Sequence, residues 1–198
     1  MNICNSLIFV GGKMVLYWLL VALAVFDVEY LWLPDWLTLG GAAFGFALTL
    51  LGFGLYGTWI SISPLPWAGG QETFRSHILG IVCKWLLGIL VAPALILIIK
   101  WTYWIVRHRD GIGLGDAKLM LLLAVWLGLP QALLAFGLGV VLGALVAIVM
   151  LAVPSARRGS ERWALSKLPL GTFLCIGGIV SGLWGGHILA AYQRWAGF

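Results

Sequence analysis

Long apolar stretches separated by short polar turns make up most of this chain. Five of the stretches have about 20 or more residues, the length that a helix needs to cross the hydrocarbon core of a bilayer. A sixth stretch is shorter. The pattern predicts an all-α membrane protein, a polytopic bundle of about six transmembrane helices. We expect these helices over residues 14–33, 36–60, 78–106, 117–129, 131–153 and 169–192.

The fourth stretch is too short for an ordinary span. It has only 13 residues, 117–129, before Pro130. A helix of this length extends about 20 Å, whereas the hydrocarbon core is about 30 Å thick. Asp116 comes directly before this helix. We therefore expect that the bilayer is thinner there or that Asp116 lies well below the membrane surface.

Composition supports the membrane interpretation and excludes several other classes of protein. Of 198 residues, 62% are hydrophobic and only 10% are charged, which excludes a soluble globule with a polar shell. The net charge of +5 then indicates basic cytoplasmic loops, so we expect a lipid bilayer and no nucleic acid among the partners. The three cysteines form no C-x-x-C pair and the three histidines form no H-E-x-x-H motif. We expect no metal and no cofactor.

Basic residues are divided unevenly between the two sides of the predicted bundle. Seven fall in or beside the turns around Asp116 and after residue 153, and three fall on the opposite side. The more basic side of a membrane protein faces the cytoplasm. Six spans then place both termini outside, and they place the turn at residues 27–35 on the same side as Asp116. Asp27 and Asp116, which are 89 positions apart, can therefore meet.

Asp27 and Asp116 are the strongest candidates for a functional site, because ionisable side chains within membrane segments are costly and usually functional. Two carboxyl groups can hydrolyse a peptide when one is ionised and takes a proton from water while the other, protonated, polarises the carbonyl. Two close aspartates in a low dielectric share one proton, which supplies both forms. A simpler interpretation is that each acid only caps a helix.

Two segments resemble the catalytic motifs of bacterial type IV prepilin peptidases. In FDVEYLWLPDWLT, residues 26–38, an aspartate lies seven residues before a proline that is followed by Asp and a Leu-Thr pair. GLGDAKL, residues 113–119, resembles the GxGD signature that this family shares with presenilin-type intramembrane aspartyl proteases. LPLGTFL, residues 168–174, is similar to a later Pro-Phe-Gly-Pro segment of the family, with Leu170 and Thr172 replacing the usual Phe and Pro. We expect that departure to touch no catalytic position.

The resemblance implies an activity as well as a fold. It places Asp27 and Asp116 at the two catalytic positions of the family, within six or more transmembrane helices. It implies cleavage of the leader peptide of a type IV prepilin or pseudopilin, at the cytoplasmic face of the bacterial inner membrane.

The resemblance also bears on domain organisation. Larger members of the family add an amino-terminal cytosolic region with C-x-x-C pairs and methylate the new amino terminus. Only 26 residues precede Asp27. We therefore expect residues 1–198 to form a single transmembrane peptidase domain, with no N-terminal zinc or methyltransferase domain and no methylation by this chain alone.

Four residues near the two aspartates are candidate substrate contacts. Gly113 and Gly115 leave room for an extended substrate backbone beside Asp116. Glu29 is two positions from Asp27 and so faces away from it on a helix, while Asp35 is placed to cap the second helix. We expect Glu29 and Asp35 to attract the basic leader that is typical of prepilins.

A small proton- or cation-coupled transporter that uses the same two acids is the main alternative function. A membrane-embedded assembly subunit is a second. Transporters usually show internal repeats or paired broken helices, and we find no convincing repeat between the two halves of this chain. The resemblance therefore favours the peptidase.

Overall fold

Helices are the only regular elements in the part of the chain that the structure describes. This computed structural model describes residues 3–30, 32–56, 74–107, 113–152 and 170–197. Their helices are α1 (Ile3–Tyr30), α2 (Asp35–Tyr56), α3 (Phe74–Arg107), α4 (Leu114–Leu127), α5 (Leu129–Ala152) and α7 (Leu170–Ala196). The prediction of an all-α fold is confirmed.

The turn between α1 and α2 differs in detail from the prediction. α1 ends at Tyr30 rather than at residue 33, and residues 32–34 are not helical. The carbonyl oxygen of Pro34 accepts hydrogen bonds from the backbone N–H groups of Leu37 and Thr38, both at 3.1 Å, and so closes the first turn of α2. Asp35 is therefore already inside the helix, and the expectation that it occupies the capping position is wrong.

α4 is the short helix that the sequence predicted. Its 14 residues correspond to about 21 Å, and almost every side chain from Asp116 to Leu127 is buried. The helix ends at Gly128, whose φ of 79° favours glycine and whose N–H donates to the carbonyl oxygen of Ala124 at 3.0 Å. The break thus comes at Gly128, not at Pro130. Pro130 lies in the first turn of α5, where a missing N–H costs no helical hydrogen bond.

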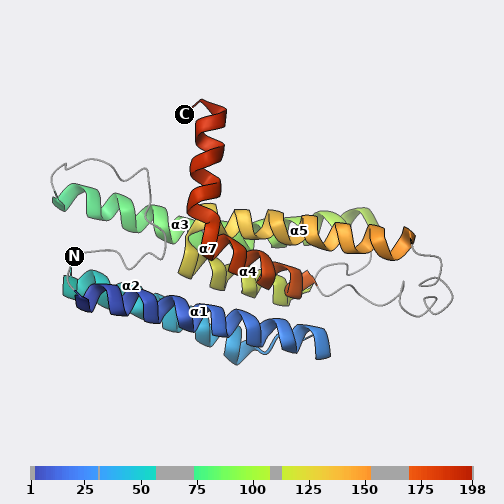
Figure 1. The fold of residues 1–198 in the computed structure, drawn as a ribbon, viewed down its shortest axis with the longest axis horizontal. Helices are drawn as coiled ribbons and strands as arrows, with labels where there is room; N and C mark the ends of the chain where they lie inside the picture. Colours follow the sequence, from blue (N-terminus) through green and yellow to red (C-terminus); the bar gives the residue numbers. More distant parts are fainter. Residues whose placement is uncertain (1–2, 31, 57–73, 108–112, 153–169, 198) are drawn as a thin grey trace.

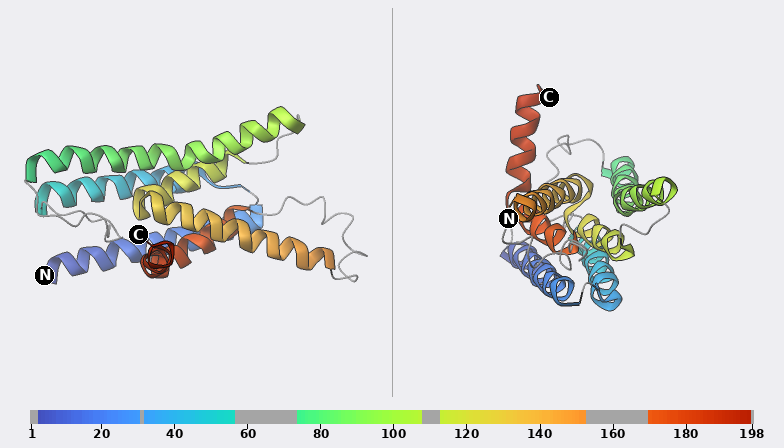
Figure 2. Two further views of the ribbon diagram at one scale, coloured as in Figure 1. Left: turned by 90° about the horizontal axis from the view of Figure 1, so that it is seen from above. Right: turned by 90° about the vertical axis from the view of Figure 1, so that its right-hand side faces the viewer.

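α4 lies at the centre of the bundle. It packs against α2, α3, α5 and α7, while α1 packs against α7 and α2. The C-terminal ends of α1, α3 and α5 and the N-terminal ends of α2, α4 and α7 point towards one end of the bundle, on the right in Figure 1. The view from above shows the same arrangement (Figure 2). Asp27, near the end of α1, and Asp116, near the start of α4, therefore lie towards the same end, as predicted.

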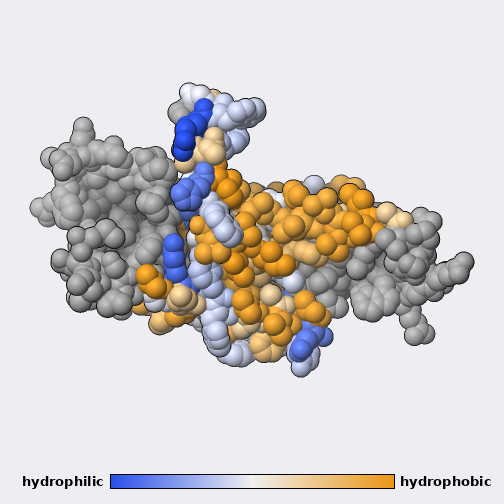
Figure 3. All heavy atoms as spheres, viewed as in Figure 1, coloured by the Kyte–Doolittle hydropathy of each residue, from blue (hydrophilic) through white to orange (hydrophobic). Residues whose placement is uncertain are grey.

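Apolar side chains cover the outside of the bundle as well as filling its core. Figure 3 shows hydrophobic residues across much of the exposed face that is not grey. Among the described residues, four helical stretches are long and apolar enough to cross a membrane: Val10–Tyr30, Trp85–Val106, Leu129–Val149 and Leu170–Ala196. So much exposed apolar surface is typical of a protein embedded in lipid. The prediction of a helical membrane protein is confirmed.

α7 is not the simple span that was predicted over residues 169–192. It is one helix from Leu170 to Ala196, but its C-terminal part turns away from the bundle and projects beyond it (Figures 1 and 2). Its buried residues all lie between Gly171 and Gly185. The first half of α7 therefore closes the bundle.

Close packing of α5 against α7 depends on glycine. A Cβ atom added at Gly177 would lie 2.3 Å from the carbonyl oxygen of Ala135, and one added at Gly139 would lie 3.1 Å from the backbone of Leu174. The two backbones therefore approach more closely than larger side chains would allow, as is common between membrane helices.

We predict that Gly177→Ala destabilises the protein, because the new Cβ atom would meet backbone rather than a movable side chain. The free energy of unfolding should fall by about 1–3 kcal/mol, measured by unfolding in detergent. Gly186→Ala is the matched control on the same helix, since a Cβ atom there would meet nothing within 4 Å. Equal stability of the two variants would contradict the close contact between the backbones.

Candidate active site

Asp27 is buried near the C-terminal end of α1, with 5% of its surface exposed. Its oxygen Oδ2 accepts two hydrogen bonds from Thr172, in the first turn of α7. The backbone N–H of Thr172 donates at 2.6 Å and its hydroxyl donates at 2.9 Å. The first N–H groups of a helix have no partner within that helix. Asp27 supplies a partner for one of them and joins the end of α1 to the start of α7.

Gly171 leaves the space that this contact needs. A Cβ atom added at Gly171 would lie 2.8 Å from Oδ2 of Asp27 and 2.9 Å from its Cγ. Both distances are too short for a non-bonded contact, so a larger residue would displace the carboxyl group. Thr172 stands where the resembling family usually has proline, a departure expected to touch no catalytic position. The structure shows that Thr172 nevertheless contacts the side chain of Asp27 directly, which the sequence did not reveal.

Asp116 lies in the first turn of α4, with 7% of its surface exposed. Its carboxyl group interacts with the backbone N–H of Gly113, the residue that precedes the helix. An acid at the third helical position commonly satisfies the start of a helix in this way. The carboxyl group of Asp116 thus lies beside the start of its own helix and remains a candidate for chemistry.

The carboxyl groups of Asp27 and Asp116 lie close enough to interact electrostatically. The thiol of Cys175, which is buried on α7, lies near both of them. α1, α4 and α7 thus meet around one small group of buried polar side chains. No motif in the sequence singles out Cys175.

The expected substrate contacts have different surroundings. Glu29 is exposed whereas Asp27 is buried, which confirms that they face different ways. Gly113 is also exposed, and a Cβ atom added there would lie 3.9 Å from Oδ2 of Asp116. Its φ of −71° is open to any residue, so only its small size matters. Gly115 instead packs against Leu33, whose Cδ1 would lie 3.1 Å from an added Cβ atom.

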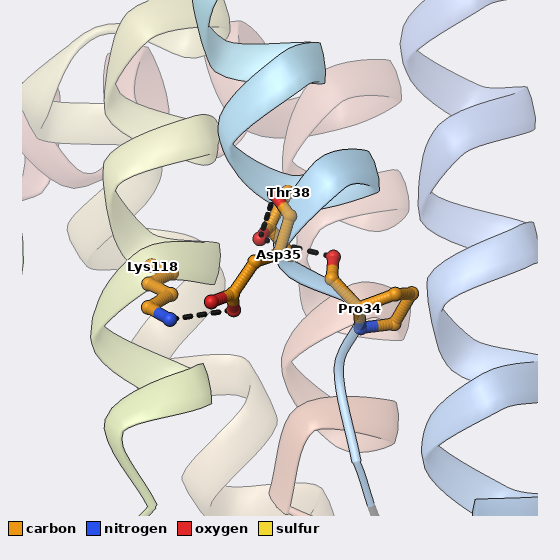
Figure 4. A network of polar contacts seen from close by, with 4 residues as sticks. All are labelled: Pro34, Asp35, Thr38 and Lys118. Atoms are coloured by element: carbon orange, nitrogen blue, oxygen red, sulfur yellow. Dashed lines mark hydrogen bonds and ion pairs between the residues drawn. The ribbon is translucent and has the colours of Figure 1, made fainter.

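Asp35 forms an ion pair with Lys118 that links the start of α2 to α4. The Nζ atom of Lys118 lies 2.5 Å from Oδ1 of Asp35 (Figure 4). The side chain of Lys118 is 32% exposed and that of Asp35 is 58% exposed. Because both are partly in solvent, the pair contributes at most about 1 kcal/mol to stability. Lys118 also offsets the negative charge that was expected to attract a basic leader. Of the two acids considered for that role, Glu29 is the better placed.

Several expectations concern residues outside the described part of the chain. They include Asp110, the turn at 108–112 and the basic loop at 154–168. The inferred orientation depends on these basic turns, so it stays a prediction. Within the described residues, no group of three or more His, Cys, Asp or Glu side chains is placed to hold a metal ion.

The fold and the site together define the class of this protein. It is a helical membrane bundle with two buried aspartates close together at one end. Residues 14–148 match the type IV leader peptidase family, and the chain belongs to that family. The match includes both aspartates and confirms the resemblance seen in the sequence.

Curated relatives are similar along nearly the whole chain. The prepilin leader peptidase/N-methyltransferase of Stutzerimonas stutzeri is 30% identical over 186 residues, or 94% of this chain. The protein of the same name from Pseudomonas putida is 31% identical over 183 residues, or 92%. The one from Pseudomonas aeruginosa is 27% identical over 188 residues, or 95%. The chain spans about half the length of these relatives, between 53% and 54%. No solved structure gives a significant match.

Proposed function

We propose that this chain is an aspartic endopeptidase of the membrane that cleaves the leader peptide of a type IV prepilin or pseudopilin. The observation that carries the proposal is that Asp27 and Asp116 are both buried at the same end of the bundle, on separate helices, and close enough for their carboxyl groups to influence each other. Membership of the leader peptidase family supports the choice of reaction and of substrate.

The proposal concerns the peptidase activity alone. The names of the curated relatives combine a leader peptidase with an N-methyltransferase, and this chain spans about half of each relative. The family match over residues 14–148 is described by the peptidase activity only. We therefore assign to the described site the hydrolysis of a peptide bond.

Both carboxyl groups act on one water molecule in the proposed reaction. The ionised carboxylate takes a proton as the water oxygen attacks the carbonyl carbon, and the protonated carboxyl group donates a hydrogen bond to the carbonyl oxygen. A proton then passes to the leaving nitrogen as the C–N bond breaks. The products are a leader that ends in a carboxylate and a mature chain that begins with an amine. Burial of the pair strengthens its interaction with the charge that develops on the carbonyl oxygen.

The substrate is proposed to enter from the end of the bundle where α2, α4 and α7 begin. Gly113 is exposed beside Asp116 and presents no side chain to an approaching backbone. We propose that this end faces the cytoplasm of a bacterial inner membrane, as the basic turns of the sequence indicate. The comparisons lend no support to the alternative of a transporter.

We predict that Asp27→Asn and Asp116→Asn each lower the rate of leader cleavage by at least about 1,000-fold, because each removes one member of the acid–base pair. The assay incubates purified protein in detergent or liposomes with a prepilin and follows the shortened product. The double variant should be no slower than either single variant, since residues that act as a unit are not additive. Asp110→Asn is the control and should cleave normally. Near-normal cleavage by either single variant, with normal expression, would contradict the mechanism.

We predict that Glu29→Gln weakens cleavage of a basic leader most at low ionic strength. Removal of an exposed negative charge should slow the association of a Lys- or Arg-rich leader, and salt screens such an effect. We expect kcat/KM to fall by about 2- to 10-fold at low salt and to be nearly unchanged at high salt. Glu29→Asp keeps the charge and is the matched control. If Glu29→Gln behaves like the wild type at every salt concentration, Glu29 does not steer the substrate.

A further inference from the structure

The first turn of α7 binds one oxygen of Asp27 and leaves the other available. Both hydrogen bonds from Thr172 end on Oδ2. Among the described residues, no side chain or backbone group donates a hydrogen bond to Oδ1. The carboxyl group is therefore held asymmetrically, with one oxygen fixed by Thr172 and one oxygen to which no described residue donates.

Two donors of Thr172 define the orientation of the Asp27 carboxyl group. The backbone N–H belongs to the first turn of a helix, where it is directed out of the helix start and needs an acceptor. The hydroxyl donates from the side chain of the same residue, so the two donors meet at a single oxygen. The hydroxyl also lies 3.5 Å from the carbonyl oxygen of Ala24. It carries only one hydrogen, and the 2.9 Å contact with Oδ2 is the better bond.

Gly171 sets the distance between the carboxyl group and α7. A Cβ atom at this position would lie within 3.1 Å of Oδ1 and closer still to Cγ and Oδ2. Alanine would thus push the whole carboxyl group away from the two donors. Gly171 allows the carboxyl group of Asp27 to come close to α7, and Thr172 holds it there through two hydrogen bonds.

We propose that Thr172 is a positioning residue for the reaction, which together with Gly171 holds Asp27 so that Oδ1 is the oxygen that activates water. The inference rests on the proposed function and assigns a role within it to two residues that lie against the carboxyl group of Asp27. Catalytic carboxyl groups work only within a narrow range of positions. A carboxyl group tied at Oδ2 loses its freedom to rotate and presents Oδ1 in one direction.

The effect of the hydroxyl can be isolated with Thr172→Val, which keeps the shape and the backbone N–H and removes one donor. We expect kcat for prepilin cleavage to fall by about 10-fold, as for the loss of one hydrogen bond to a charged group, while KM changes by less than about twofold because the hydroxyl acts through Asp27. Thr172→Ser keeps both donors and should restore kcat to within about threefold of the wild type. A residue with only a packing role would not be rescued by serine, which lacks the methyl group.

Gly171→Ala tests the same contact from the other side. It should lower kcat by more than about 100-fold, because the carboxyl group itself is displaced. Gly186→Ala, on the open part of the same helix, should leave kcat unchanged. Thermal unfolding of every variant shows whether the fold is intact. If Thr172→Val proves unstable, Gly171→Ala and Thr172→Ser still test whether α7 positions Asp27. The inference then requires a large loss of kcat in Gly171→Ala and a nearly normal kcat in Thr172→Ser.

Three outcomes would overturn the inference: wild-type kcat in Thr172→Val, equal losses in Thr172→Val and Thr172→Ser, or a change confined to KM. Each of these leaves the proposed function intact if Asp27→Asn and Asp116→Asn remain inactive. Failure of the proposed function looks different, because the wild type would then not cleave a prepilin or would cleave it without Asp27. The two ideas can therefore fail separately.

Discussion

The hydrogen bonds from Thr172 to Asp27 connect two helices that are distant in the sequence, and the site is arranged around them. A buried carboxyl group needs donors, and the start of a buried helix needs acceptors. The end of α1 and the start of α7 satisfy both needs with bonds of 2.6 and 2.9 Å. These bonds fix Asp27 in the space where α4 begins.

α4 then determines where Asp116 lies. A helix of 14 residues is too short to reach both surfaces of a bilayer of ordinary thickness, and Asp116, in its first turn, is buried within the bundle. Two contacts fix α4 beside α2. Lys118 pairs with Asp35 near the start of the helix, and the indole N–H of Trp126, near its end, donates to the carbonyl oxygen of Gly41 at 3.0 Å. With α4 held at both ends, Asp116 has little freedom to move relative to Asp27.

Much of this arrangement follows from the sequence, because it depends on the lengths and order of apolar segments. The helical bundle, the short α4 and the placement of the two aspartates at one end are all of this kind. The family resemblance also came from local motifs. The GxGD glycines were expected to admit a substrate, but Gly115 packs against Leu33 within the protein. A glycine in a motif does not reveal which neighbour needs the space.

The remaining features depend on partners that sequence patterns do not specify. Thr172 lies 145 positions from Asp27, and Lys118 lies 83 positions from Asp35. Neither pair shares a helix face or a motif, so only the packing of the bundle shows them. The end of α4 was misplaced for a related reason. Pro130 is the stronger sequence signal, but a proline fits the first turn of the next helix, and Gly128 makes the actual break.

The central claim is that Asp27 and Asp116 share one buried site, and thiol cross-linking in the membrane tests it most directly. Asp27→Cys and Asp116→Cys would be combined in a chain whose native cysteines are replaced by alanine, and treated with a short bifunctional thiol reagent. The account predicts rapid cross-linking within one chain. It also predicts much slower cross-linking of the control pair Glu29→Cys and Asp116→Cys, because Glu29 is exposed and faces away from Asp27. Cross-linking of the Asp27 pair no faster than that of the control pair would contradict the account.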